Sequence, residues 1–476
     1  MQPLKITVLF SAVSFSAGCG FQAYRPAPVT PVASAAAVRA RTLESDPLRV
    51  FVWDSLPAVT GEWPLKQWSL PELTLAALYY NPALQIARAR LSEAEAGVLT
   101  ARTRPNPNAT GSVGGETAPE NPWIAGFVGS LPIETAGKRG YRIIAAERQV
   151  DVARWDLAST AWNVRAQVRS ALLDYITARD NLNLLEAEER LRGEQVQLLE
   201  QRLSVGMIPR PEVDAARILH TQVLLAVQAA EGRIAQTEAS LAAAIGVPTT
   251  ALNRQKIVWS AYAEPPNAES LSPATIQRDA VLNRIGIRRA LANYSASEAA
   301  LRSEIAKQYP DFDIGPDYAF EEGAHLFSVA VGLALPVFNR NQGPIAAAKA
   351  LRDQRAAEFV EVQAAGIAQG EQALAKYTAA LSQLAEARHL MQQSLTQEQA
   401  TRAAFQAGQS DRVGLNGAQL QTAVTAVAQL NALYGAQQAL GELENAVQRP
   451  LLPGDIQPLS PRSPVLKVRK ESEAHE

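Results

Sequence analysis

Residues Leu326 to Leu335 read Leu-Phe-Ser-Val-Ala-Val-Gly-Leu-Ala-Leu, and this stretch decides the fold class. Bulky apolar side chains recur at every second position from Phe327 to Leu335, and the positions between them hold Ser, Ala or Gly. The preceding stretch, about 311–320, alternates between apolar or aromatic residues and small or acidic ones. This period of two is typical of a β-strand with two unlike faces. One face suits lipid and the other water, and about ten residues suffice for a tilted bilayer crossing.

Two similar strand-like pieces occur earlier in the chain, at about 108–116 and 122–131. The second piece in each pair ends at a Leu-Pro dipeptide, and the later pair covers about 311–320 and 325–335. Four strands cannot close a barrel around a pore, and open sheet edges cannot remain in lipid. We therefore expect strands from several copies to combine, and three copies of four strands would supply twelve.

The rest of the pattern is helical and rich in alanine. Helices are expected at about 69–104 with a kink at Asn81-Pro82, and at about 140–203, 211–246, 273–308 and 344–406. A turn at Gly408 and a last helix to about 448 follow. At about 1.5 Å per residue, the helix over 140–203 would reach roughly 95 Å. The two shorter helices of each half sum to nearly the length of the long one. We expect them to stack end to end, antiparallel beside the long helix.

The two halves of the pattern correspond in order and spacing. Matching landmarks differ by 202 to 205 positions: Pro105 and Pro310, Pro132 and Pro336, Gly140 and Gly343, and Gly206 and Gly408. A slowly drifting offset indicates an internal duplication. We interpret 69–248 and 273–448 as the two repeats, 249–272 as their connection and 449–476 as a Pro-rich C-terminal tail.

The N-terminus has the pattern of an export signal. Lys5 precedes a short apolar run, and the small residues Ser16-Ala17-Gly18 lead to Cys19, the single cysteine of the chain. The run is too short to span a bilayer. We interpret 1–18 as a signal peptide and Cys19 as a lipid-attachment site resembling the bacterial lipobox. Residues 19–68 would then form an extended segment behind the anchor.

Composition excludes several function classes. The 476 residues include 45 Lys or Arg and 47 Asp or Glu, a formal net charge of −2, which gives no support to nucleic-acid binding. One cysteine excludes an intrachain disulfide framework and a Cys-rich zinc site. The four histidines lie far apart in the sequence. We expect no catalytic residues, no metal site and no cofactor.

Several short motifs resemble the TolC family of outer-membrane efflux ducts. They are Ala-Ala-Leu-Tyr-Tyr-Asn-Pro-Ala-Leu at 76–84, Leu-Pro at 131–132 with Ala-Gly-Lys-Arg at 136–139, and Leu-Pro-Val-Phe-Asn-Arg-Asn at 335–341 with Gly343. The likeness extends from about 70 to 448. The Ala-Gly-Lys-Arg turn looks most like the branch paired with heavy-metal pumps of the resistance-nodulation-division type.

The resemblance implies a mainly α-helical subunit with a small β part. Three subunits would combine a 12-stranded transmembrane β-barrel with a periplasmic α-barrel. Such a homotrimer would be the exit duct of a tripartite system, passing metal ions or drugs from an inner-membrane pump and a periplasmic adaptor to the exterior. The turns at 204–211 and 407–413 would form the periplasmic tip. The family's usual acidic constriction falls on Gly414 and Gly417 here, so Asp411 and Arg412 are the expected substitutes.

The remaining candidate residues lie in the expected periplasmic tip and in the expected β-barrel. The tip residues expected in adaptor docking and gating are Gly206, Arg210, Gly408, Asp411 and Arg412. Asp311, Asp313 and Asp317 would line the barrel lumen, and Trp123, Phe127, Tyr318 and Phe327 would form an interfacial aromatic girdle.

Two other functions remain open on the sequence. A type I secretion duct would pass polypeptides through the same fold. A periplasmic structural coiled-coil lipoprotein would span the envelope without conducting. An enzyme has little support.

Overall fold

A computed structural model gives the fold. It describes residues 23–55, 62–115, 117, 123–253, 255–267, 274, 276, 278, 284–321, 323–452 and 455. The predicted signal peptide, Cys19 and almost all of the C-terminal tail lie outside these residues. The chain divides into two units, 1–40 and 41–476. Within the first unit, α1 (Pro31–Arg39) begins at Thr30, whose side chain accepts a hydrogen bond from the Ala33 amide.

The N-terminal segment is more helical than expected. Besides α1, residues Asp46–Ser55 form α2, so the expectation of extended backbone over 19–68 is wrong at these two places. Both helices have a proline in the first turn, where the missing N–H has no cost. Leu48 and Val52 lie one turn apart on α2 and are fully buried. Tertiary burial of this short stripe, rather than a long periodic pattern, stabilises α2.

Besides α2 and the strands described below, the second unit contains seven helices and one short 3-10 helix within the described residues. They are α3 (Leu70–Tyr80), α4 (Pro82–Arg102), α5 (Lys138–Ser204), α6 (Arg210–Ile245), η1 (Thr249–Ala251), α8 (Ile285–Ala306), α9 (Gln342–Gln406) and α10 (Arg412–Val447). None of the described helices combines the length and apolar character that a bilayer crossing needs.

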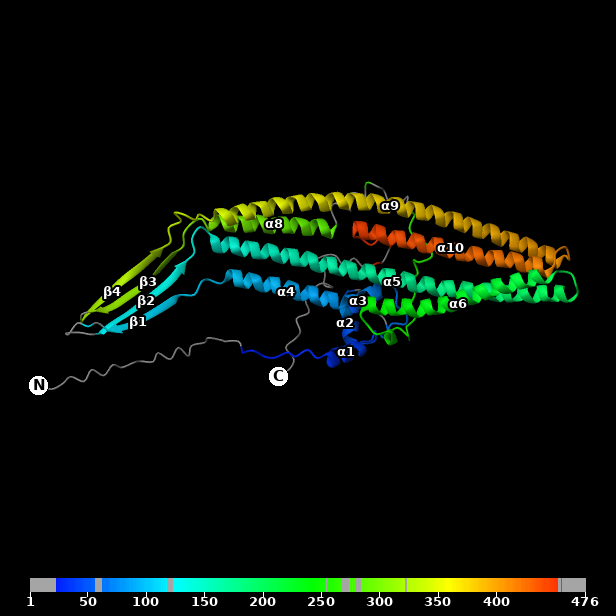
Figure 1. Cartoon of the computed structure of the whole chain (residues 1–476), viewed down its shortest axis with the longest axis horizontal. Coiled ribbons are helices and arrows are strands. Elements are labelled where there is room, and N and C mark those ends of the chain that lie inside the picture. Colours follow the sequence, from blue (N-terminus) through cyan, green and yellow to red (C-terminus); the bar gives the residue numbers. More distant parts are fainter. Residues whose placement is uncertain are drawn as a thin grey trace. The chain divides into compact units, whose positions relative to one another are not determined.

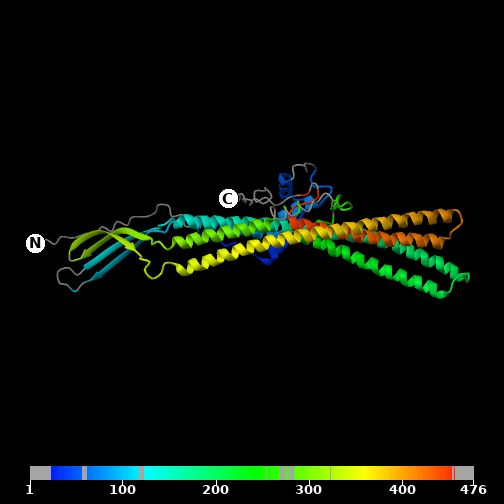
Figure 2. The ribbon, with the colours of Figure 1, turned by 90° about the horizontal axis from the view of Figure 1, so that it is seen from above.

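The expected break at Asn81-Pro82 is confirmed, and it docks α4 against the end of α6. The Asn81 side chain accepts a hydrogen bond from the Ala83 amide at 2.9 Å and donates one to the Ala244 carbonyl at 3.0 Å. Arg41 donates to the carbonyls of both Tyr80 and Gly246. The α3–α4 pair and α6 thus meet end to end along α5, as Figures 1 and 2 show.

The later helices repeat this arrangement. Both α8 and α10 pack along α9, and their ends meet where the Ile285 amide donates a hydrogen bond to the Gln448 side chain. In addition, α5 contacts both α8 and α10, so the two sets of helices lie side by side (Figure 1). The expected stacking of two short helices beside each long one is therefore present in both.

A four-stranded antiparallel sheet extends from one end of these helices. Its strands are β1 (Asn108–Gly115), β2 (Trp123–Ile133), β3 (Phe312–Glu321) and β4 (Ala324–Leu333), in the order β1-β2-β3-β4. Pairing of β2 with β3 joins segments that are far apart in the sequence. Each observed strand lies within about two residues of its expected bounds.

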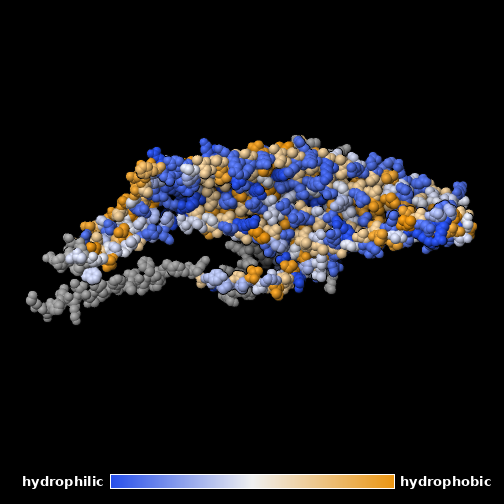
Figure 3. Space-filling view, in the orientation of Figure 1, coloured by the Kyte–Doolittle hydropathy of each residue, from blue (hydrophilic) through white to orange (hydrophobic). Residues whose placement is uncertain are grey.

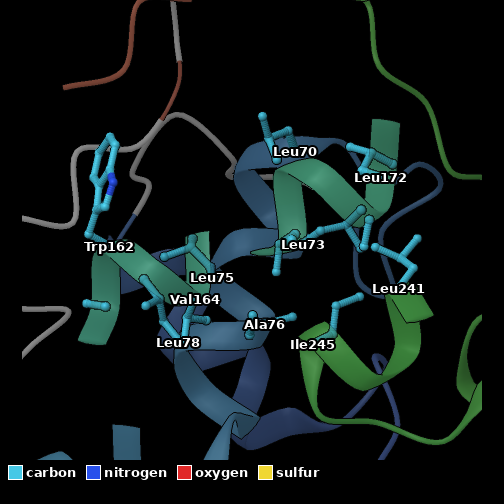
Figure 4. Close-up of a cluster of buried hydrophobic side chains, with 14 of the residues drawn as sticks. Leu70, Leu73, Leu75, Ala76, Leu78, Trp162, Val164, Leu172, Leu241 and Ile245 are labelled. Carbon is cyan, nitrogen blue, oxygen red and sulfur yellow. The ribbon is translucent and has the colours of Figure 1, made fainter. Parts of the chain in front are cut away.

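The hydrophobic core is centred where α3 packs against α5 and the end of α6. Leu73, Leu75 and Leu78 of α3 are fully buried in the cluster shown in Figure 4. There Leu73 lies toward Leu172 of α5, and Leu75 and Leu78 lie beside Val164 of α5. Burying a leucine side chain contributes about 1.5–3 kcal/mol. This core holds the break between the short helices against the middle of α5.

A buried ionic cluster joins α5 to α10. Arg165 and Arg169, one turn apart on α5, each place a guanidinium nitrogen 3.1 Å from a carboxylate oxygen of Glu444. Arg169 also donates to the backbone carbonyl of Gln437 at 2.9 Å. All four side chains are buried, and burial lowers the pKa of Arg169. Removing one partner of such a pair would leave the other charge buried without a counter-charge, which is destabilising.

Candidate functional site

One face of the sheet carries a row of aromatic side chains. Phe127 on β2 pairs with Tyr318 on β3, which pairs in turn with Phe327 on β4. Directly paired residues of antiparallel strands project to the same face. The ring centroids of Tyr318 and Phe327 are 5.2 Å apart. Trp123 lies four positions from Phe127 on the same strand, so it shares this face.

The same face is apolar and exposed along β4. Phe327, Val329, Val331 and Leu333 are 78, 70, 67 and 53% exposed, respectively. Figure 3 shows apolar residues along the sheet and where it joins the helices, whereas hydrophilic and apolar residues are interspersed over the helices. An exposed apolar face of this extent marks an interaction with lipid or protein.

The opposite face holds two of the three predicted acidic residues. Asp313 accepts a hydrogen bond from Ser130 Oγ at 3.2 Å, and Asp317 accepts one from Ser328 Oγ at the same distance. Asp311 differs, because the chain has not yet entered β3 at that residue. Its carboxylate lies 2.8 Å from Lys138 Nζ and accepts a hydrogen bond from the Thr135 amide. Asp311 therefore links the segment before β3 to the segment between β2 and α5.

Two glycine turns join the helix pairs at the other end. Gly206 and Gly408 have φ of +75° and +72°, a left-handed conformation that side chains disfavour. The residue after each glycine donates its amide to the carbonyl five positions earlier: Met207 to Arg202 and Gln409 to Ala404. The two turns thus share one helix-ending geometry.

The two helices that leave these turns are held differently. At the start of α10, Asp411 contacts Arg202 of α5, and Arg412 Nε lies 2.7 Å from Glu194 of α5. Asn416 also donates to the Leu191 carbonyl of α5 at 3.0 Å. The start of α10 is therefore tied to α5 by three side chains.

The equivalent positions at the start of α6 make only a local contact. Arg210 lies 3.7 Å from Asp214, one turn further along the same helix. Farther along, Arg217 of α6 lies 2.5 Å from Glu200 of α5, which closes the first hairpin on itself. The connection between the two hairpins thus comes from α10.

Asp411 also caps its helix. Its carboxylate accepts a hydrogen bond from the Gly414 amide at 2.7 Å, which satisfies an otherwise unpaired donor of the first turn. This backbone hydrogen bond and the neighbouring Arg202 guanidinium hold the pKa of Asp411 below its usual range. Asp411 is therefore ionised, and paired with Arg202, at neutral pH.

The two glycines at the expected constriction occupy the first turns of α10. A Cβ at Gly414 would lie 2.9 Å from Ser410 Oγ, whereas Gly417 has open space around it. Among the described residues, no group of three or more His, Cys, Asp and Glu side chains could hold a metal ion.

Sequence reasoning missed the α5 partners of the residues at the start of α10. Arg202, Glu194 and the Leu191 carbonyl lie more than 200 residues before the groups they bind, and nothing in their local pattern distinguishes them from other solvent-facing helical positions. The buried pair Arg165 and Arg169 had a weak signal, since arginines four residues apart share a helix face with the apolar Trp162.

The comparisons with known proteins agree with this geometry. The family model for outer membrane efflux proteins matches residues 73–247, from α3 to just beyond α6. The cobalt-zinc-cadmium resistance protein CzcC of Cupriavidus metallidurans is 25% identical over 282 residues, covering 59% of this chain and 66% of CzcC. The protein CyaE of Bordetella pertussis is 25% identical over 327 residues, covering 63% of this chain and 68% of CyaE. The chain thus spans about two thirds of each relative.

A solved structure shares the fold. The outer membrane protein VceC of Vibrio cholerae matches with a TM-score of 0.64 and 17% identity, covering 79% of this chain and 95% of VceC. The sheet, the paired long helices and the order of the elements are therefore those of a known fold. Together with the family-model match over residues 73–247 and the two curated relatives, they show that the chain is similar to outer membrane efflux proteins.

Proposed function

We propose that this protein is the outer-membrane exit duct of a tripartite efflux system. The observation that carries the proposal is the exposed apolar face of β4, on a sheet attached to long helices. An apolar face about ten residues long suits the lipid, and the 67 residues of α5 extend about 100 Å beyond it. Energy comes from the pump, and the duct itself performs no chemistry.

Three subunits form the conducting unit. Four strands leave two open edges, so three copies close a 12-stranded barrel in which every strand is paired. Trp123, Phe127, Tyr318 and Phe327 then face lipid at its interfaces, and Asp313 and Asp317 face the lumen. The two halves, 69–248 and 273–448, are duplicated repeats that supply equivalent walls of the helical conduit, and 249–272 connects them.

The glycine turns form the periplasmic tip. Gly206, Arg210, Gly408, Asp411 and Arg412 make the surface on which a periplasmic adaptor docks. Asp411 and Arg412 also hold the aperture closed, since both bind α5. The pump is an inner-membrane transporter of the resistance-nodulation-division type. Similarity to a protein named for cobalt, zinc and cadmium resistance favours divalent metal ions as the cargo.

Planar-bilayer recording tests the duct directly. Purified protein should form long-lived channels, and chemical cross-linking in mild detergent should trap three subunits. A purified protein that forms no pores would favour a non-conducting structural lipoprotein. Passage of an unfolded polypeptide with a cognate pump, but not of metal ions, would favour a type I secretion duct.

The N-terminus anchors the duct. Residues 1–18 are removed on export, Cys19 becomes lipidated, and 19–68 links the anchor to the first repeat. Cys19→Ala should abolish labelling by radioactive palmitate. Unchanged labelling of this variant would contradict the assignment.

A further inference from the structure

The boundary between sheet and helices carries a concentrated positive charge. Four segments cross it: 102–107, 134–142, 304–311 and 334–343. Together they hold seven Lys or Arg and three Asp or Glu, a difference of 7 − 3 = +4, in a chain whose net charge is −2. We call these four segments the collar. All four lie at the same end of the helices, where the strands begin (Figure 1).

Some collar cations stabilise the junction itself. Lys138 donates to the Tyr309 carbonyl just after α8, and Arg139 donates twice to the Arg102 carbonyl at the end of α4. Arg142 pairs with Glu134 and also donates to the Ala101 carbonyl. Cations at helix C-termini satisfy unpaired carbonyls and favour the helix dipole. These contacts explain the Ala-Gly-Lys-Arg turn.

Arg104 and Arg340 do not make such stabilising contacts with the described residues. Both are exposed, and neither side chain has an ion pair or hydrogen bond with the described residues. Arg104 borders a groove of about 510 Å³ whose other lining residues include Thr103, Pro105 and Ala146. The groove thus combines apolar lining atoms with the guanidinium of Arg104, which has no described counter-charge.

Apolar side chains project from the same loops. Phe338, two residues before Arg340, is 96% exposed, and Leu335 and Val337 are 70 and 62% exposed. Apolar residues beside cations are the pattern of a segment that lies in a membrane interface, with the apolar groups inserted and the cations at headgroup level.

We propose that the collar binds anionic phospholipids of the periplasm-facing leaflet, with Arg104 and Arg340 contacting the headgroup phosphates. The proposal rests on the proposed function, which puts the sheet in the bilayer and the collar at its inner surface. Guanidinium groups pair with phosphate through parallel hydrogen bonds. Basic residues at a membrane surface attract anionic lipid, and each adds to the attraction. The groove beside Arg104 accommodates the glycerol end of the lipid.

Native mass spectrometry of the full chain from nanodiscs tests this inference. The nanodiscs contain phosphatidylethanolamine with a minor fraction of phosphatidylglycerol. Phosphatidylglycerol should be retained on the protein above its bulk fraction. Arg104→Gln and Arg340→Gln should each lower the relative affinity for phosphatidylglycerol about fivefold. The matched control is Arg233→Gln, an equal charge change at an exposed position on α6, which should retain the lipid as the unmodified chain does.

The outcomes separate the two proposals. Retention of both lipids in their bulk ratio, or equal loss in all three variants, would overturn the collar assignment while leaving the duct intact. Failure of the protein to enter nanodiscs of any composition would overturn the proposed function and the collar with it. Weakening of the preference at high salt would support an electrostatic contact.

Discussion

The carboxylate of Asp411, at the start of α10, contacts the guanidinium of Arg202, near the end of α5. The two residues belong to different helical hairpins and lie 209 positions apart in the sequence. This contact, the Arg412–Glu194 pair and the Asn416 hydrogen bond fix the second hairpin against the first. If the proposed duct opens by separation of the hairpins, these contacts must break.

Arg202→Gln should increase the open fraction of the channel. An exposed ion pair contributes about 0.2–1 kcal/mol, so its loss should raise the open-to-closed ratio up to about fivefold. Single-channel recording in planar bilayers measures this ratio. Arg217→Gln is the control, because Arg217 binds Glu200 within the first hairpin and should leave the ratio unchanged. Equal effects of the two variants would show that the contact between hairpins does not restrain the tip.

The same contact predicts a pH dependence. Because the folded-state pKa of Asp411 is lowered, its stabilising contribution is present above the usual aspartate pKa and is lost as pH falls through the lowered value. The open fraction should thus stay constant from neutral pH down to about 4 and rise only below that. Asp411→Asn should abolish this rise. A transition near neutral pH would contradict the role of Asp411.

Gly441→Ala should destabilise the fold. A Cβ at this position of α10 would lie 2.4 Å from Arg169 Nη1 and 3.2 Å from Arg169 Cζ. Arg169 is buried and bound to Gln437 and Glu444, so its displacement should cost about 2–4 kcal/mol. Denaturant unfolding followed by circular dichroism measures the change.

Gly435→Ala is the matched control for that variant. Gly435 lies in the same helix and has no atom within 4 Å of the Cβ position. Alanine is the better helix former, so this change should stabilise the protein by roughly 0.5–1 kcal/mol. A similar loss of stability in both variants would show that Gly441 is not needed for the approach of Arg169.

The two faces of β4 should respond differently to charge. Val331→Arg introduces a cation on the apolar face, which should cost about 2–4 kcal/mol near the bilayer midplane. Ser328→Arg places the same side chain on the opposite face, where its present neighbour is Asp317. The yield of folded oligomer in the outer membrane should fall for Val331→Arg and remain near normal for Ser328→Arg. Equal yields would mean that the apolar face does not contact lipid.

The sequence predicted the strands well because their signals are local. Alternation from Phe327 to Leu335 gives the residues of β4, and Pro336 ends the pattern, so the predicted and observed bounds differ by no more than two residues. The kink at Asn81-Pro82 was equally predictable from the sequence, because asparagine is a good capping residue and proline fits the first turn of a helix.

The contacts of the candidate site were not predictable in the same way. Whether Asp411 meets Arg202 depends on how two hairpins with similar local sequences align in space. Arg210 and Arg412 occupy equivalent positions after their glycines, yet one contacts its own helix and the other contacts α5. Helix α2 was missed because only Leu48 and Val52 form its buried stripe.

The free edges of the sheet have a consequence for biogenesis. Within the described strands, β1 pairs only with β2 and β4 only with β3. Each unpaired backbone group would cost several kcal/mol in hydrocarbon. Insertion of a single subunit into the bilayer is therefore unfavourable, even though one face of its sheet is apolar. In the proposed three-subunit duct, subunits must then meet before or during insertion. The rate of membrane entry should rise more steeply than linearly with subunit concentration, and subunits that arrive singly should accumulate in the periplasm.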